Sequence, residues 1–91
     1  MQAIVTKKSV NYVQEKMHNI TFNLKVTEGA SELINQDFTC QYAQGDSPAQ
    51  KVALMVEQMQ ICIDRYNAEQ AIFNSAALDS AVAAIQGGLN L

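Results

Sequence analysis

The chain has 91 residues, of which 48% are hydrophobic, and its six basic and nine acidic residues give a net charge of −3. This length predicts a single domain over residues 1–91, and the hydrophobic content is that of a folded chain rather than a disordered one. No apolar run approaches the ~18 residues of a membrane span, and no long apolar region follows the first residues, so we expect no secretory signal, no membrane association and a cytoplasmic location.

The polar surface is rich in amides and poor in charge. Charged residues make up 16% of the chain, whereas ordinary domains have about 25%. Ten Gln and seven Asn take their place, and such a surface loses little when it is desolvated against another protein. Residues 46–91 carry two basic and five acidic side chains, which argues against nucleic acid as a partner.

Residues 1–15 show a weak alternation of apolar and polar side chains, which predicts a short or bulged edge strand. Lys7 and Lys8 fit an edge, because charge there discourages pairing with other chains. A short helix over residues 9–16 is the competing interpretation.

Two clear strands follow. Residues 16–27 alternate strictly, with an apolar face of Ile20, Phe22, Leu24 and Val26. Glu28–Ser31 is predicted to be a turn in which Gly29 takes a positive φ. Residues 32–42 return as the partner strand, with Ile34, Phe38, Cys40 and Tyr42 on one face and Gln36 as the exception there. One apolar and one polar face per strand indicate an antiparallel sheet.

Residues 48–73 are predicted to form one long amphipathic helix. Ser47 and Gln50 could form a capping box around it, and Pro48 suits the first helical position. Its apolar stripe repeats every seven residues and consists of Val52, Met55, Val56, Met59, Cys62, Ile63, Tyr66 and Phe73.

A second, shorter helix is predicted over about residues 75–86. Its apolar residues centre more than about 100° away from the face of Tyr66 and Phe73, so one straight helix could not bury both sets on one surface. We therefore expect a break at Asn74 and Ser75 and an end at Gly87–Gly88. Leu89 and Leu91 are expected to pack back.

These elements predict an α+β fold: an antiparallel two- or three-stranded β-meander followed by a long and a short helix, both on one face of the sheet. Leu54 and Ile61 point away from the main stripe, so they pack either on the second helix or on another subunit. With Met55 they form the expected interface. A sheet with unpaired edges and surplus apolar helix positions favours a homo-oligomer, most simply a two-fold dimer, with other protein subunits as further partners.

Few residues carry chemistry. His18 is the only histidine and is expected at a strand end, because a metal ligand or a base would need converging partners. Cys40 and Cys62 fall on inward faces and are interpreted as buried thiols that could meet, rather than as a disulfide or redox pair. No metal, cofactor or catalytic residue is predicted.

Two groups of carboxylates and one serine are candidate site residues, and each has a simpler interpretation. Asp37 and Asp46 lie near predicted loops. Ser47 has no histidine near it in sequence to activate it and is interpreted as a helix cap. Glu57 and Asp64, seven residues apart, are typical of a solvated helix face.

Three hypotheses for the function follow. The first is a non-catalytic structural or assembly subunit that acts as a homo-oligomer, for which a phage or prophage virion component is an association from composition with no motif behind it. The second is a small-molecule-binding or regulatory module with an apolar pocket between sheet and helix, lined by Phe22, Phe38, Met59 and Tyr66. The third, a small enzyme that uses Asp37, Asp46 or His18, is the least favoured.

Overall fold

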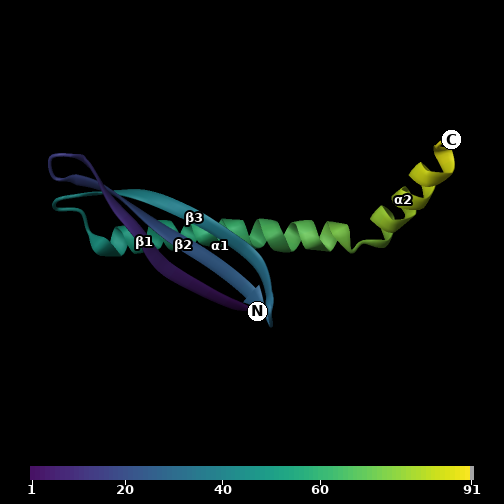
Figure 1. Ribbon diagram of the computed structural model, residues 1–91, viewed down its shortest axis with the longest axis horizontal. Coiled ribbons are helices and arrows are strands. Elements are labelled where there is room, and N and C mark those ends of the chain that lie inside the picture. Colours follow the sequence, from purple (N-terminus) through teal and green to yellow (C-terminus); the bar gives the residue numbers. More distant parts are fainter. Residues whose placement is uncertain (91) are drawn as a thin grey trace.

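The computed structural model describes residues 1–90, which form a three-stranded sheet followed by two helices (Figure 1). The strands are β1 (Gln2–Gln14), β2 (Met17–Glu28) and β3 (Ser31–Ala43), and the helices are α1 (Pro48–Phe73) and α2 (Ala76–Gly88). The molecule is elongated, measuring 63 × 29 × 21 Å. The predicted α+β class and the order of strands and helices are confirmed.

The sheet is an antiparallel meander in the order β1-β2-β3. Phe22 lies opposite Phe38, and Leu24 opposite Gln36, as the predicted strand faces require. The β2–β3 turn places Gly29 at φ 57°, also as predicted. The turn between β1 and β2 was missed: Glu15 and Lys16 form it, and Lys16 adopts φ 63°, a left-handed conformation that a non-glycine residue rarely takes.

The first strand is a full edge strand of 13 residues rather than a short one, and the alternative helix over residues 9–16 is wrong. Its pairing with β2 shifts twice, between Lys7 and Ser9 and between Tyr12 and Gln14. These irregularities change which side chains share a face, which is why the alternation in residues 1–15 is weak.

The outer face of the sheet is held by polar pairs that cross the strands. Asn23 Nδ2 donates to Asn35 Oδ1 over 2.6 Å and to Asp37 Oδ1 over 3.0 Å. The hydroxyls of Thr21 and Thr39 are 2.9 Å apart. These groups satisfy one another at the surface, so the middle of this face is polar.

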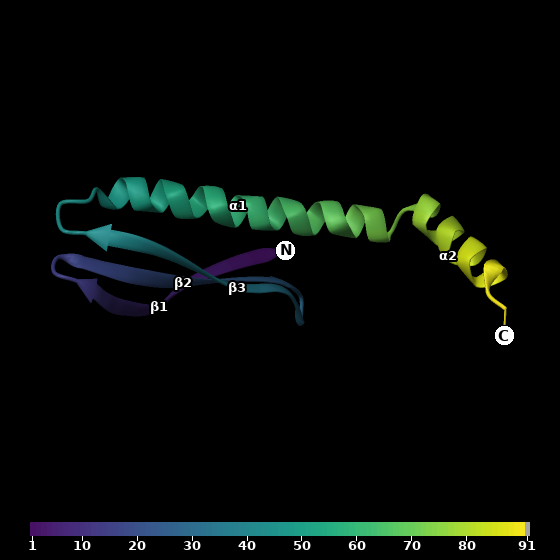
Figure 2. The ribbon, with the colours of Figure 1, turned by 90° about the horizontal axis from the view of Figure 1, so that it is seen from above.

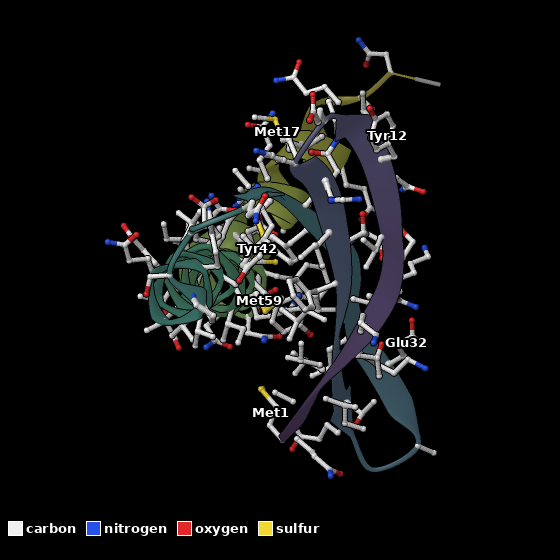
Figure 3. All side chains as sticks on the ribbon, turned by 90° about the vertical axis from the view of Figure 1, so that its left-hand side faces the viewer. Met1, Tyr12, Met17, Glu32, Tyr42 and Met59 are labelled. Atoms are coloured by element: carbon white, nitrogen blue, oxygen red, sulfur yellow. The ribbon has the colours of Figure 1, made fainter. Side chains whose placement is uncertain are left out.

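Helix α1 lies on the other, apolar face of the sheet, and Figure 2 shows it as a second layer that extends beyond the end of the strands. The core forms where the two layers meet: Leu24 and Val26 are each 1% exposed and pack with Met59. Met55 and Cys62 are the other buried residues of the helix. Figure 3 shows Met59 and Tyr42 between α1 and the sheet.

Helix α2 projects away from the sheet beyond the end of α1 and buries none of its residues (Figures 1 and 2). The prediction that both helices cover one face is therefore wrong. The reason is the length of α1, which extends beyond the end of the strands. Helix α2 therefore begins where there is no sheet to cover. Leu89 is exposed rather than packed back, and Leu91 lies outside the described residues.

The helix ends follow the prediction in part. The break falls at Asn74 and Ser75, where Ser75 Oγ accepts a hydrogen bond from the Leu78 N–H over 3.2 Å. Pro48 opens α1, but Ser47 makes no capping hydrogen bond with its side chain, so the predicted capping box is absent there. Gly87 and Gly88 belong to the last turn of α2 instead of following it.

Candidate functional site: an open apolar groove

An open groove of about 320 Å³ lies between the sheet and the first half of α1. Apart from the Lys51 side chain and the Tyr42 hydroxyl, its walls are apolar. All three strands contribute to one wall, through Val5, Ile20, Phe22, Cys40 and Tyr42. The helix supplies the other, through Pro48, Lys51, Val52, Met55, Val56 and Met59.

The groove is open because α1 is not centred on the sheet. The helix packs mainly against β3, so within residues 1–90 the apolar side of β1 is largely uncovered. Val5 on β1 is 53% exposed, and Val52 and Val56 on the helix flank that faces this strand are 62% and 61% exposed. Three valines therefore border a surface that water reaches but does not solvate well.

The predicted pocket residues divide between this groove and other places. Phe22 and Met59 line the groove. Tyr66 lines a second, more polar depression of about 270 Å³ with Gln36 and Glu69. Phe38 packs against the core cluster instead.

Sequence reasoning missed Val5, Val52 and Val56 as groove residues. Val52 and Val56 were assigned to the buried stripe of the helix, and Val5 to an uncertain strand. Their exposure follows from the sideways displacement of α1 toward β3, for which the pattern of residues 48–73 gives no signal, since an offset helix and a centred one have the same periodicity.

The predicted interface residues also differ in position. Leu54 and Ile61 are exposed on a side of α1 that α2 does not cover. Met55 is buried against the sheet and so belongs to the core. Of the two alternatives for Leu54 and Ile61, packing on the second helix of the same chain is excluded by the position of α2.

Asp46 holds together the loop that leads into α1. Its Oδ2 accepts a hydrogen bond from the Ala43 N–H over 2.7 Å and lies 3.4 Å from Lys51 Nζ. The backbone hydrogen bond from Ala43, and then the Lys51 ammonium, hold the pKa of Asp46 below its ordinary value of 3.8. These contacts give Asp46 a structural role at the mouth of the groove.

Asp37 lies on the opposite, outer face of the sheet. Hydrogen bonds from the Lys8 ammonium and from Asn23 lower the pKa of its carboxyl group. The salt bridge joins β1 to β3 across β2. Asp37 and Asp46 therefore belong to different faces and do not form one site.

The contacts of His18 and of the two cysteines are packing contacts and one hydrogen bond. The His18 ring meets the Tyr12 ring edge to face, with centroids 5.9 Å apart, at the turn end of the sheet. Cys40 lines the groove, whereas Cys62 lines the second depression and its thiol donates to Gln36 Oε1 over 3.4 Å. Both thiols are buried and free.

The carboxylates Glu57 and Asp64 both lie on the exposed surface of α1. Asp64 accepts a hydrogen bond from Gln60 one turn earlier, over 2.9 Å, and Glu57 is exposed on the same helix. Within residues 1–90, no group of three or more His, Cys, Asp or Glu side chains is placed to hold a metal ion.

Comparisons with protein-family models, with curated proteins and with solved structures give no match to this chain. Within the described part of the chain, neither helix is long and apolar enough to span a membrane.

Proposed function

We propose that this chain is a non-catalytic assembly or interaction subunit that acts as a homo-oligomer. The observation that carries the proposal is the distribution of large apolar side chains. In the described residues, 16 of them are exposed and only six hydrophobic residues are buried. A folded protein that leaves this much apolar surface in water is typically completed by a protein partner.

The accessible surface supports the same proposal. The chain exposes 6830 Å², whereas a compact globular chain of 10.0 kDa would expose about 5,200 Å². The excess of about 1,600 Å² per chain is about twice the ~800 Å² that each partner buries in a standard protein interface. The radius of gyration is 19.6 Å, compared with about 12 Å for a compact domain of this length.

The exposed apolar residues are spread along the whole molecule rather than gathered at one end. Leu54 and Ile61 lie on α1, Val10 lies on β1, and Ile85 lies on α2. An elongated subunit with apolar surface on several sides suits repeated contacts in a larger particle. A phage or prophage virion part remains our example of such a particle, proposed from composition and shape.

Sedimentation equilibrium tests this function directly. The full chain is measured from low micromolar to near-millimolar concentration, and we expect a mass that rises to that of a dimer or a larger oligomer. The mass of the double variant Leu54→Glu/Ile61→Glu is compared with that of Gln58→Glu, which adds a charge to an exposed polar position of the same helix. A wild-type chain that stays monomeric over the whole range would overturn the proposal.

The groove favours a second candidate function, the binding of a small apolar ligand. Its volume of about 320 Å³ and its apolar walls would suit an acyl chain or another elongated hydrophobic molecule. A ligand at 100 times its Kd stabilises the folded chain by about 2.7 kcal/mol. A thermal-shift series with single-chain amphiphiles checks this. Val56→Glu is the control variant, because it places a charge in the apolar groove. Equal melting temperatures with and without every ligand would count against it.

A further inference from the structure

Helix α2 has an apolar stripe that is not packed against any other part of residues 1–90. Its apolar side chains form one stripe, Leu78, Ala81, Val82 and Ile85, and the helix carries a single charged residue, Asp79. Ile85 is 65% exposed, and no residue of the helix is buried. A free helix of 13 residues is marginal in water, and two glycines in its last turn weaken it further. A helix of this kind becomes stable by packing its apolar stripe.

The groove beside α1 has the length and the chemistry to receive it. Along α1 it runs from Pro48 to Met59, which is about 17 Å, and α2 with its 13 residues is about 20 Å long. The apolar stripe of α2 runs from Leu78 to Ile85, and the groove is apolar apart from Lys51 and the Tyr42 hydroxyl. At one end of the groove Lys51 forms a salt bridge with Asp46 over 3.4 Å, and α2 would add its single charge, Asp79, beside this pair.

The α2 of the same copy does not reach this groove. If α2 folded back along its own α1, it would start beside Phe73 and extend about 20 Å, and so would end beside Gln60. The groove begins only at Met59 and continues away from α2 to Pro48. The groove of a second copy has no such restriction.

We propose that α2 of one copy docks into the groove of a second copy, in a two-fold dimer whose α1 helices run antiparallel. In this arrangement residues 61–73 of each α1 lie beside residues 48–60 of the other. An α2 folded back on its own α1 then lies along the partner's groove, parallel to the partner's α1. The two-fold axis makes the exchange reciprocal, so both grooves are filled at once.

The same arrangement fixes which ends meet. The start of α2 lies beside the start of the partner's α1, which brings Asp79 to the end of the groove that carries Lys51. The joint at Asn74 and Ser75 supplies the turn between α1 and α2. The inference rests on the proposed function, since it names the surface through which copies associate.

The first test compares two charge substitutions on α2. Ile85→Glu places a carboxylate in the apolar stripe, and Ala83→Glu adds the same charge on another side of the same turn. By sedimentation equilibrium we expect Ile85→Glu to weaken the dimer about 100-fold and Ala83→Glu to change it less than about threefold. Because Ile85 makes no core contact, the sheet of both variants should fold normally, which far-ultraviolet circular dichroism verifies.

The second test identifies the contact itself. Isotope-labelled chain is mixed with unlabelled chain, and filtered nuclear Overhauser spectra record contacts between copies only. We expect cross-peaks from the methyl groups of Val82 and Ile85 to those of Val5 and Val56. Contacts of these α2 methyl groups that occur only within one copy, or with Leu54 of a partner instead of the groove, would overturn the docking.

The two proposals fail in different ways. A wild-type chain that is monomeric at every concentration removes both the assembly function and the docking. A dimer that Ile85→Glu leaves as tight as the wild type removes the docking alone, because the copies then associate through another surface such as the Leu54 and Ile61 side of α1.

Discussion

The two helices of this chain differ in burial far more than in composition. Helix α1 carries five charged residues and still buries Met55, Met59 and Cys62, whereas α2 carries one charged residue and buries nothing. The difference arises from position: α1 lies over the sheet for most of its length, and α2 begins beyond it (Figure 2). An apolar stripe therefore decides which side of a helix will be buried, but the reach of the rest of the fold decides whether it is buried within the same chain.

The largest expected effect is a difference in unfolding free energy between substitutions in the core and substitutions in α2. Leu24→Ala should lower the free energy of unfolding by about 2–5 kcal/mol, because the side chain is fully buried and leaves a cavity. Ile85→Ala, measured by urea unfolding in dilute solution, should change it by less than about 0.5 kcal/mol. If Leu24→Ala does not fold, Leu24→Val gives a smaller loss in the same direction. Equal effects at the two sites would show that α2 packs within the monomer.

Amide hydrogen exchange measures the difference in stability between the sheet and α2 residue by residue. In dilute solution the amides of β2 should exchange only through global unfolding, and those of α2 should exchange rapidly through local opening. Raising the concentration should slow exchange in α2 most, and in β2 as well, since docking protects the helix directly and also stabilises the folded chain against global unfolding. Protection of α2 that is independent of concentration would contradict the contrast drawn here.

The two helix starts differ in their capping. Ser75 Oγ accepts from the Leu78 N–H, and the Ser47 side chain caps nothing. Ser75→Ala should therefore destabilise α2 by about 1 kcal/mol, which appears as a loss of helical chemical shifts over residues 76–80. Ser47→Ala should alter the first turn of α1 by less than about 0.5 kcal/mol. A larger effect at Ser47 would mean that its hydroxyl does cap in solution.

The smallest effect is a pH dependence confined to the packed region. The pKa of Asp46 is lowered in the folded chain by the Ala43 N–H and Lys51, so its stabilising contribution is fully present above the ordinary pKa of the carboxyl group. It is lost as the pH falls below that value and through the lowered folded pKa. Asp46→Asn should flatten this acid limb in urea unfolding between pH 5 and pH 2, with Asp64→Asn as the control. An unchanged slope would remove the structural role of Asp46.

Strand and helix boundaries were predictable where a single periodicity continued without interruption. Residues 48–73 gave the helix with its limits, and the strict alternation of Ile20, Phe22, Leu24 and Val26 gave the β2 face. The weak alternation before them reflects two shifts of register in β1, which put an extra residue between positions that share a face. The turn at Glu15 and Lys16 had no glycine or proline to mark it.

The candidate groove was the less predictable part. Phe22 and Met59 were expected in a pocket between sheet and helix, and both line the groove. Val5 and Val56 were not, because their exposure depends on how far α1 is displaced across the strands. That displacement is set by how the side chains of the helix and of the sheet pack against each other, and it cannot be inferred from the sequence of either element alone.

The irregular pairing of β1 bears on how large an assembly of these chains can grow. This strand has an open edge, but its pairing with β2 is interrupted near two consecutive lysines, Lys7 and Lys8. A kinked, charged border is a poor template for a strand from another molecule. Growth of one continuous cross-molecule sheet at this border is therefore disfavoured. A species prone to fibril formation would first have to lose the interrupted pairing of its N-terminal strand.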